Sequence, residues 1–521
     1  MTDVVAPTRT RRFLGGLGLG YLQTALVVLV NLWLTPYLLR HLGQHEYGLW
    51  LLAAQLLLYL GLMDLGIVAL LPREVAYTAG TAGPDRPDDL PALVGRTARL
   101  VMWQTPAVLT VGVAVWWFIP HEWAPLRWPL LLVVLAFTAT FPLRIFHGVL
   151  QGLQDLFYLG AAQLAGWTAG TIITIAGVMA GLGLYSLALG WIAGQALPAV
   201  LAWRRLRARF PGAVPERLPP LAQAAMGERF GRGVWISVSQ VAQVLLNGTD
   251  LVVIGTLLGP EAVVPYACTG KLVMLLGNQP QLFMQMALPA LSELRATAPR
   301  ARLFEVSTSM TQVMLIGSGA VVAVVLAVNQ PFVTWWVGGS QFGGTGLTLL
   351  FTLGMLLRHL SATAGYTLFC FGHERRLALT AIAEGLVGLG AMLVLVPIVG
   401  AAGAAVGLLA ATAVVGLPSK LGALSREQGT SLAALLAPLR PWFLRCAVVC
   451  AGVAALATLW PASGFWPLLA SAATVGAVYG AVMLPVLFAP PLGPMVRHQL
   501  QPLAPFVNGL ARRLVREPTA P

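Results

Sequence analysis

Two neighbouring apolar segments, 233–258 and 263–288, each carry a narrow stripe of polar side chains. Within each stripe the residues recur at intervals of three, four or seven positions. At about 100° per residue, such intervals place side chains along one face of an α-helix. The stripes consist of Gln240, Gln243, Asn247 and Asp250 in the first segment, and of Lys271, Asn278, Gln281 and Gln285 in the second.

Polar groups aligned along apolar helices favour a wet cavity, because polar groups left in hydrocarbon carry a large free-energy cost. Carboxamides both donate and accept hydrogen bonds, as sugar hydroxyls require. The six amides of the stripes, together with Asn31, are therefore candidate sugar-binding groups. Hydrogen bonding between packed helices is the alternative use of these amides, and the spacing leaves it open.

Three basic residues, Arg144, Lys271 and Arg358, lie within apolar spans rather than between them. A pyrophosphate in a low-dielectric cavity needs fixed positive charge, and arginine offers phosphate oxygens a bidentate fork. Together with His359, these residues form the candidate phosphate-binding set. Two alternatives remain open: Arg144 could extend to cytoplasmic head groups, and Lys271 could neutralise an intramembrane acid such as Asp250.

Three acids, Asp64, Asp250 and Glu384, lie deep within apolar spans. Intramembrane carboxylates in transporters often bind a coupling proton or Na⁺, and the alternative is a structural ion pair. We therefore treat the three residues as candidates for ion coupling, with both interpretations open.

The sequence predicts no metal site, no catalytic site and no cofactor other than a coupling H⁺ or Na⁺. The four cysteines all lie in apolar runs and lack the spacing of a zinc ligand set. The nearest match to a phosphate-cradling loop has Pro265 in place of its first glycine and Leu272 in place of its Ser or Thr. ATP hydrolysis is not expected.

The composition places these residues in an all-α polytopic membrane protein. Of 521 residues, 57% are hydrophobic and only 10% are charged, whereas a soluble protein carries about 25% charged residues. The mean hydropathy is +0.78. The net charge of +13 resides in short connections between apolar runs, without the aromatic-interleaved basic patch of a nucleic-acid-binding protein.

Runs of about 20 apolar residues, long enough to cross a bilayer, indicate about fourteen transmembrane helices. With the N-terminus inside, the outer loops hold only two of the 32 Lys and Arg residues, Arg40 and Arg127. This asymmetry satisfies the positive-inside rule and predicts that both termini are cytoplasmic. The expected spans lie near 13–38, 48–71, 91–118, 128–150, 158–180, 182–203, 231–258, 262–289, 304–328, 346–371, 376–398, 401–420, 441–460 and 464–488.

The first half of the chain reappears in the second. Three matches share an offset of 217 positions, namely Arg12-Phe13 with Arg229-Phe230, Gln23 with Gln240 and Pro72 with Pro289. Two further pairs are Leu42-Gly43 with Leu258-Gly259, and Gly152 with Gly372. The offset joins span 1 to span 7, so the repeat is parallel and substrate is expected between its two lobes.

The predicted organisation follows from the repeat. Two six-helix lobes are expected, followed by two extra helices. The boundaries are 1–204 for the N-terminal lobe, 205–230 for a basic cytoplasmic linker, 231–425 for the C-terminal lobe, 426–488 for spans 13 and 14, and 489–521 for a cytoplasmic tail.

The stretch 34–50, LTPYLLRHLGQHEYGLW, and the corner 152–157, GLQDLF, resemble the polysaccharide flippases of the multidrug/oligosaccharidyl-lipid/polysaccharide exporter superfamily. The resemblance implies export of polyprenyl-pyrophosphate-linked oligosaccharide by alternating access, for cell-surface polysaccharide synthesis. It also implies the bacterial inner membrane as location, a lipid-linked glycan as substrate, and a polysaccharide polymerase and glycosyltransferases as partners.

Three alternatives remain: a multidrug or cation antiporter of the same superfamily, a lipid II flippase, and a membrane-embedded enzyme of glycan assembly. The two spans beyond twelve argue against the antiporter. The short outer loops leave no room for an ordered catalytic loop, so we expect that the protein is not an enzyme.

Overall fold

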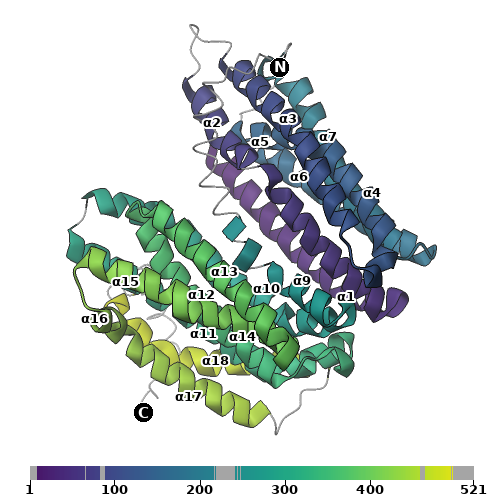
Figure 1. Ribbon diagram of the computed structural model, residues 1–521. Coiled ribbons are helices and arrows are strands. Elements are labelled where there is room, and N and C mark those ends of the chain that lie inside the picture. Colours follow the sequence, from purple (N-terminus) through teal and green to yellow (C-terminus); the bar gives the residue numbers. More distant parts are fainter. Residues whose placement is uncertain are drawn as a thin grey trace, which may run out of the picture. The chain divides into compact units, whose positions relative to one another are not determined.

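The computed structural model describes residues 9–64, 66–81, 89–215, 218, 241–242, 244–246, 248–297, 299–457, 464–493 and 496. Every regular element in this part of the chain is a helix, so the all-α fold class is confirmed (Figure 1). Most of the predicted linker 205–230 and of the tail 489–521 lies outside the described residues. The predicted lobe boundaries stay predictions.

Eleven helical stretches of the described residues are long and apolar enough to cross a membrane, so the chain is a multi-pass membrane protein. The first stretch, Leu26–Gly61, joins two predicted spans, because α1 (Arg9–Gly61) contains the first and, after a kink at Gly43, forms the beginning of the second. The other ten stretches each coincide with one predicted span. The predicted spans 231–258 and 262–289 overlap residues whose backbone or side chains lie outside the described part.

The chain divides into two compact units, residues 1–265 with 392–404, and residues 266–391 with 405–521. In the first unit, α6 and α7 pack along each other through small residues, and a side chain at Gly166 or Gly170 would overlap the neighbouring helix. Its elements are α1, η1 (Leu62–Asp64), α2 (Ile67–Thr81), α3 (Asp89–Trp117), η2 (His121–Trp123), α4 (Ala124–Thr140), η3 (Phe141–Leu143), α5 (Arg144–Gly152), α6 (Leu156–Met179), α7 (Leu184–Arg209), η4 (Pro211–Ala213) and α9 (Thr249–Leu257).

The second unit is built around α11, which packs against α12, α17 and α18. The two C-terminal helices are held there by a buried cluster in which the Trp442 indole donates a hydrogen bond of 3.1 Å to the Tyr479 hydroxyl. Its elements are α10 (Pro260–Thr297), α11 (Arg300–Val337), η5 (Gly339–Gln341), α12 (Thr345–Cys370), α13 (Glu374–Val399), α14 (Ala402–Ala411), the π-helical turn η6 (Thr412–Gly416), α15 (Leu417–Gln428), α16 (Leu432–Leu436), η7 (Ala437–Leu439), α17 (Arg440–Ala457) and α18 (Phe465–Phe488). Parts of α10, α13 and α14 belong to the first unit.

The repeat is visible in the backbone. Gly43, at the kink of α1, has φ of 83°, and Gly259, between α9 and α10, has φ of 90°. A positive φ is readily adopted only by glycine, which explains why the matched Leu-Gly pairs recur.

The corner after the fourth span of each half corrects one predicted match. In the first corner the Asp155 amide donates to the Leu150 carbonyl, and the left-handed residue is Gln154, with φ of 60°. In the second corner the His373 amide donates to the Leu368 carbonyl, and the left-handed residue is Gly372, with φ of 81°. Gly372 is therefore equivalent to Gln154, not to Gly152 as the sequence match proposed.

Candidate functional site

The described residues of the polar stripe of α10 are partly exposed. Lys271 and Gln281 are half-buried, Asn278 is exposed, and Met274 between them is 61% exposed. The neighbouring Gly270 and Gly277 instead contact residues of α12. At 100° per residue, Lys271 and Asn278 lie about 80–120° around the helix from these glycines, whereas Gln281 lies within about 40° of them.

Lys271 forms no hydrogen bond or ion pair with the described residues of the second unit. A half-buried ammonium in an apolar span keeps its charge at a cost unless an anion or water solvates it. This position could hold an anionic substrate group.

Several predicted site residues lie outside the described residues. Gln240, Gln243 and Asn247 have no described structure, and the side chains of Asp64 and Gln285 are likewise not described. Asn31 is half-buried on α1, and its backbone carbonyl accepts a hydrogen bond of 3.0 Å from Thr35.

Asp250 belongs to a polar contact between α1 and α9 in the first unit. Its carboxylate accepts a hydrogen bond of 2.9 Å from the Leu251 amide and acts electrostatically on Tyr59. The Tyr59 hydroxyl donates a 2.6 Å hydrogen bond to the Gly248 carbonyl, and the Gln55 amide lies against Gly248. Gln55 and Tyr59, four residues apart on one helix face, went unnoticed in the sequence although their spacing could have indicated them.

Arg144 does not extend freely into a cavity in this structure. Its guanidinium donates a 3.3 Å hydrogen bond to the Gly61 carbonyl, at the last residue of α1. The same group lies 5.9 and 5.7 Å from the ring centroids of Phe137 and Phe141, within cation–π range. Arg144 thus supplies a partner to a carbonyl that the end of α1 leaves without one.

Arg358 and His359 point in different directions, although the sequence grouped them as phosphate ligands. Arg358 is exposed, whereas His359 is 6% exposed. The Ser318 hydroxyl donates to the Met314 carbonyl, so its oxygen accepts from Nδ1 of His359 at 2.6 Å. This places His359 as a packed histidine between α11 and α12.

Glu384 is engaged at both of its carboxylate oxygens. Thr412 donates to Oε1 at 2.7 Å, and the Lys420 ammonium lies 3.5 Å from Oε2. Lys420 also donates a 2.8 Å hydrogen bond to the hydroxyl of Ser361. The Glu384 side chain is only 4% exposed, and that of Lys420 15%. Of the two open interpretations of Glu384, this geometry favours the structural ion pair.

Lys420 lies on α15, at the last position of the expected span 401–420. The π-helical turn Thr412–Gly416 lies one turn before it and presents Thr412 to the carboxylate. A side chain at Gly416 would overlap the Glu384 carboxylate, which would then have to shift. A π-turn in a membrane helix often marks a functional position.

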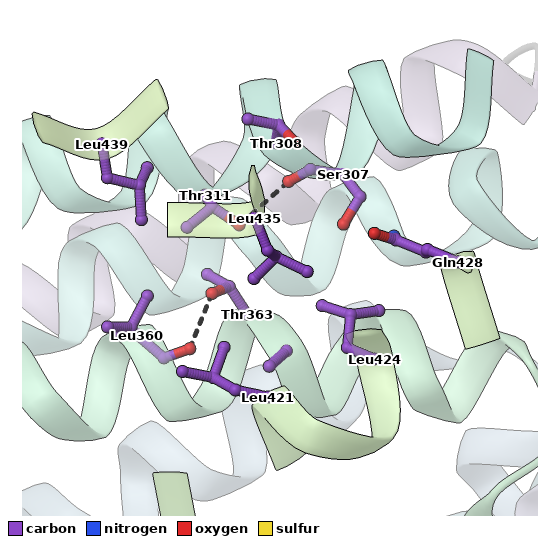
Figure 2. Close-up of a pocket in the computed structure, with 11 residues that line it drawn as sticks. Ser307, Thr308, Thr311, Leu360, Thr363, Leu421, Leu424, Gln428, Leu435 and Leu439 are labelled. Carbon is purple, nitrogen blue, oxygen red and sulfur yellow. Dashed lines mark hydrogen bonds between the residues drawn. The ribbon is translucent and has the colours of Figure 1, made fainter. Parts of the chain in front are cut away.

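A small cavity lies between α11, α12 and α15 in the second unit (Figure 2). One wall carries the hydroxyls of Ser307, Thr308 and Thr311, and leucines close the other side. The Gln428 amide is buried at its edge without a hydrogen-bond partner among the described residues. A polar cavity of this kind suits ordered water.

The described residues contain no cluster of three or more His, Cys, Asp or Glu side chains that could hold a metal ion. The four cysteines are free, and three of them are buried. Cys446 and Cys450 lie one turn apart with their sulfur atoms 3.9 Å from each other.

Comparison with known proteins gives one family match. Residues 154–343 match the model of a family described as polysaccharide biosynthesis protein. The match begins inside the GLQDLF corner, so the predicted resemblance is confirmed. No curated protein matches the chain in sequence.

Two solved structures resemble the fold. The lipid II flippase MurJ, in an inward closed conformation, superposes with a TM-score of 0.65 at 12% identity, covering 90% of this chain and 99% of that one. An inward-facing multidrug resistance MATE family transporter of the MOP superfamily gives 0.61 at 12% identity, covering 77% and 93%. At this identity the likeness establishes the fold, which is that of these transporters.

Proposed function

We propose that this chain, which combines the MOP-superfamily transporter fold with a polysaccharide-biosynthesis family segment, flips lipid-linked oligosaccharide across the membrane. The substrate would be a polyprenyl-pyrophosphate-linked oligosaccharide that moves from the cytoplasmic to the outer leaflet by alternating access. The observation that carries the proposal is the family match over 154–343. The polar stripe of α10 supports it, since it offers the residue types that a charged glycan needs.

Lys271 is the residue we assign to the pyrophosphate, because no described neighbour in its own unit neutralises it. Asn278 and Gln281, on the same face of α10, would bind sugar hydroxyls, as would Asn31. The exposed Arg358 would add positive charge near the head group. The polyprenyl tail stays in lipid while the head group crosses.

Coupling to H⁺ or Na⁺ would fall to Asp64 or Asp250, since Glu384 already has a cationic partner. The protein would work in a bacterial inner membrane with both termini in the cytoplasm. A polysaccharide polymerase and glycosyltransferases would act on its product and supply its substrate. No catalytic step is assigned to the chain.

Transport of a fluorescent lipid-pyrophosphoryl glycan in proteoliposomes tests the proposal. We expect Lys271→Ala to slow flipping about tenfold or more, because a hydrogen bond to a charged group contributes about 1.5–3 kcal/mol. Met274→Ala is the matched control, since Met274 lies exposed on the same face one turn away. Absence of flipping by the wild-type protein, or wild-type rates in Lys271→Ala, would contradict the proposal.

The MATE fold likeness favours a second candidate, an antiporter for organic cations. Cation-gradient-dependent efflux of a fluorescent organic cation, unaffected by Lys271→Ala, would support it. The MurJ likeness favours lipid II as a substrate, and flipping of lipid II in preference to the oligosaccharide would identify that activity. Formation of a new glycan product in detergent would indicate an enzyme instead.

A further inference from the structure

An open hollow of about 440 Å³ lies at the start of α13, beside α15, in the second unit. Its volume falls in the range of small-molecule sites. None of its residues takes part in the function proposed above. The lining residues are Gly372, His373, Arg375, Arg376, Leu379, Thr380 and Ser419.

The hollow is basic at its rim and hydroxyl-lined at its back. Arg375 and Arg376 are exposed, and the Arg376 guanidinium reaches the Ser419 carbonyl at 3.5 Å. The hydroxyls of Thr380 and Ser419 lie 3.0 Å apart and tie α13 to α15. Guanidinium and hydroxyl groups are the donors that phosphate oxygens accept from most strongly.

Two acids adjoin the lining residues of the hollow. His373 contacts Glu427, with 3.0 Å between Nε2 and Oε2. Glu374 is exposed in the first turn of α13.

An apolar strip continues from the hollow along the same helix. Leu379 is 51% exposed, Leu386 56% and Val387 45%. At 100° per residue, Arg375, Leu379 and Leu386 lie within about 40° of one another around the helix. A free anion would need only the charged end, whereas a lipid would use both the charged end and the apolar strip.

We propose that this hollow binds the phosphate group of an anionic membrane lipid, with its chain along the exposed strip of α13. Basic pockets beside transmembrane helices bind lipid head groups through the same combination of charge and apolar contact. The inference does not depend on flipping, because it concerns a surface that the proposed substrate path does not use.

Native mass spectrometry of the full chain in detergent, titrated with phosphatidylglycerol, tests the site. We expect the double variant Arg375→Gln/Arg376→Gln to weaken binding of the first lipid at least tenfold. Arg440→Gln/Arg445→Gln removes the same charge from α17 and should leave binding within about twofold of wild type. Equal loss in both double variants would mean diffuse attraction and would overturn the proposal.

Further measurements distinguish binding of a lipid from binding of a free anion. Leu386→Gln should weaken phosphatidylglycerol binding, whereas inorganic phosphate should compete only weakly. Competition by inorganic phosphate at the lipid's own concentration would identify a free-anion site and overturn the lipid assignment. The double variant Arg375→Lys/Arg376→Lys keeps the positive charge but cannot bind a phosphate through two parallel N–H groups, so we expect an affinity between those of wild type and the Gln variant. Wild-type affinity would show that bidentate guanidinium contacts play no part. Failure here would leave the Lys271 transport assay unaffected.

Discussion

At the scale of single residues, the second unit contains a buried ion pair whose partners lie 36 positions apart. Glu384, Lys420, Thr412 and Ser361 satisfy one another in a region from which water is largely excluded. A buried ion pair stabilises the folded state little more than apolar residues of similar size would, but removal of one partner leaves the other charge buried and unpaired. The network therefore makes a sharp stability prediction.

We expect Lys420→Met to destabilise the protein by about 3–5 kcal/mol, the usual cost of leaving a buried charge unpaired. The double variant Glu384→Gln/Lys420→Met should recover most of the loss, because the amide that replaces the carboxylate can still accept from Thr412 and carries no charge. Thermal unfolding in detergent measures both effects. A single variant as stable as wild type would show that water already reaches the carboxylate.

At the scale of helices, the second and fourth spans of the first unit are both interrupted. The second breaks between α1 and α2, at η1 and at Gly66 with φ of 71°, and the fourth breaks at η3. Arg144, the first residue of α5, binds the last carbonyl of α1 and so joins the two interruptions. The corresponding helices of the second unit, α10 and α12, run without a break over their described backbone.

Beyond these interruptions, α2 and α5 pack tightly against each other. A side chain at Gly152 would overlap Val75 and Pro72, and one at Gly148 would press on Leu71. Such close glycine packing joins two short helices into one body. Since short 3₁₀ turns often serve as hinges, we expect α2 and α5 to move together about them.

Spin labels at Ala76→Cys on α2 and Trp117→Cys on α3, in a background without the native cysteines, measure this movement. Arg144→Gln should broaden the distance distribution of that pair, because the Gly61 carbonyl loses its partner, and Arg144→Lys should restore it in part. The pair Ala76→Cys and Gln151→Cys, both within the moving body, should stay unchanged. Independent changes in both pairs would argue against a joint movement.

At the scale of the molecule, the chain is largely apolar and folds into two compact units. The glycines at 43 and 259 recur in kind and conformation, and spans 13 and 14 pack onto α11 through Tyr479. The predicted orientation puts the loop around η5 outside and the corner after α5 inside.

Cysteine labelling in intact cells checks this orientation. A membrane-impermeant maleimide should label Ser340→Cys, which is exposed in η5, without permeabilisation. Gln151→Cys, also exposed, should react only after the membrane is opened. The reverse pattern would invert the topology and place the C-terminal tail outside.

The fold class and the spans that the described residues cover were predictable because hydropathy and helical periodicity are local properties of the chain. The same holds for the face shared by Lys271, Asn278 and Gln281, which needs only the pitch of one helix. The repeat was also visible, but its register at the second corner was off by two positions. The backbone hydrogen bonds of the two corners, rather than identity of residue type, identify Gln154 as the counterpart of Gly372.

Contacts between distant segments were not predictable. The sequence around Lys420 does not distinguish it from the arginines between the apolar spans, and its partner Glu384 lies on another helix. Likewise, the inward turn of His359 depends on Ser318 of α11, and the use of Arg144 depends on where α1 ends. Whether an intramembrane charge serves a substrate, an ion or a neighbouring helix depends on which groups surround it, because a low-dielectric interior strongly penalises an unpaired charge.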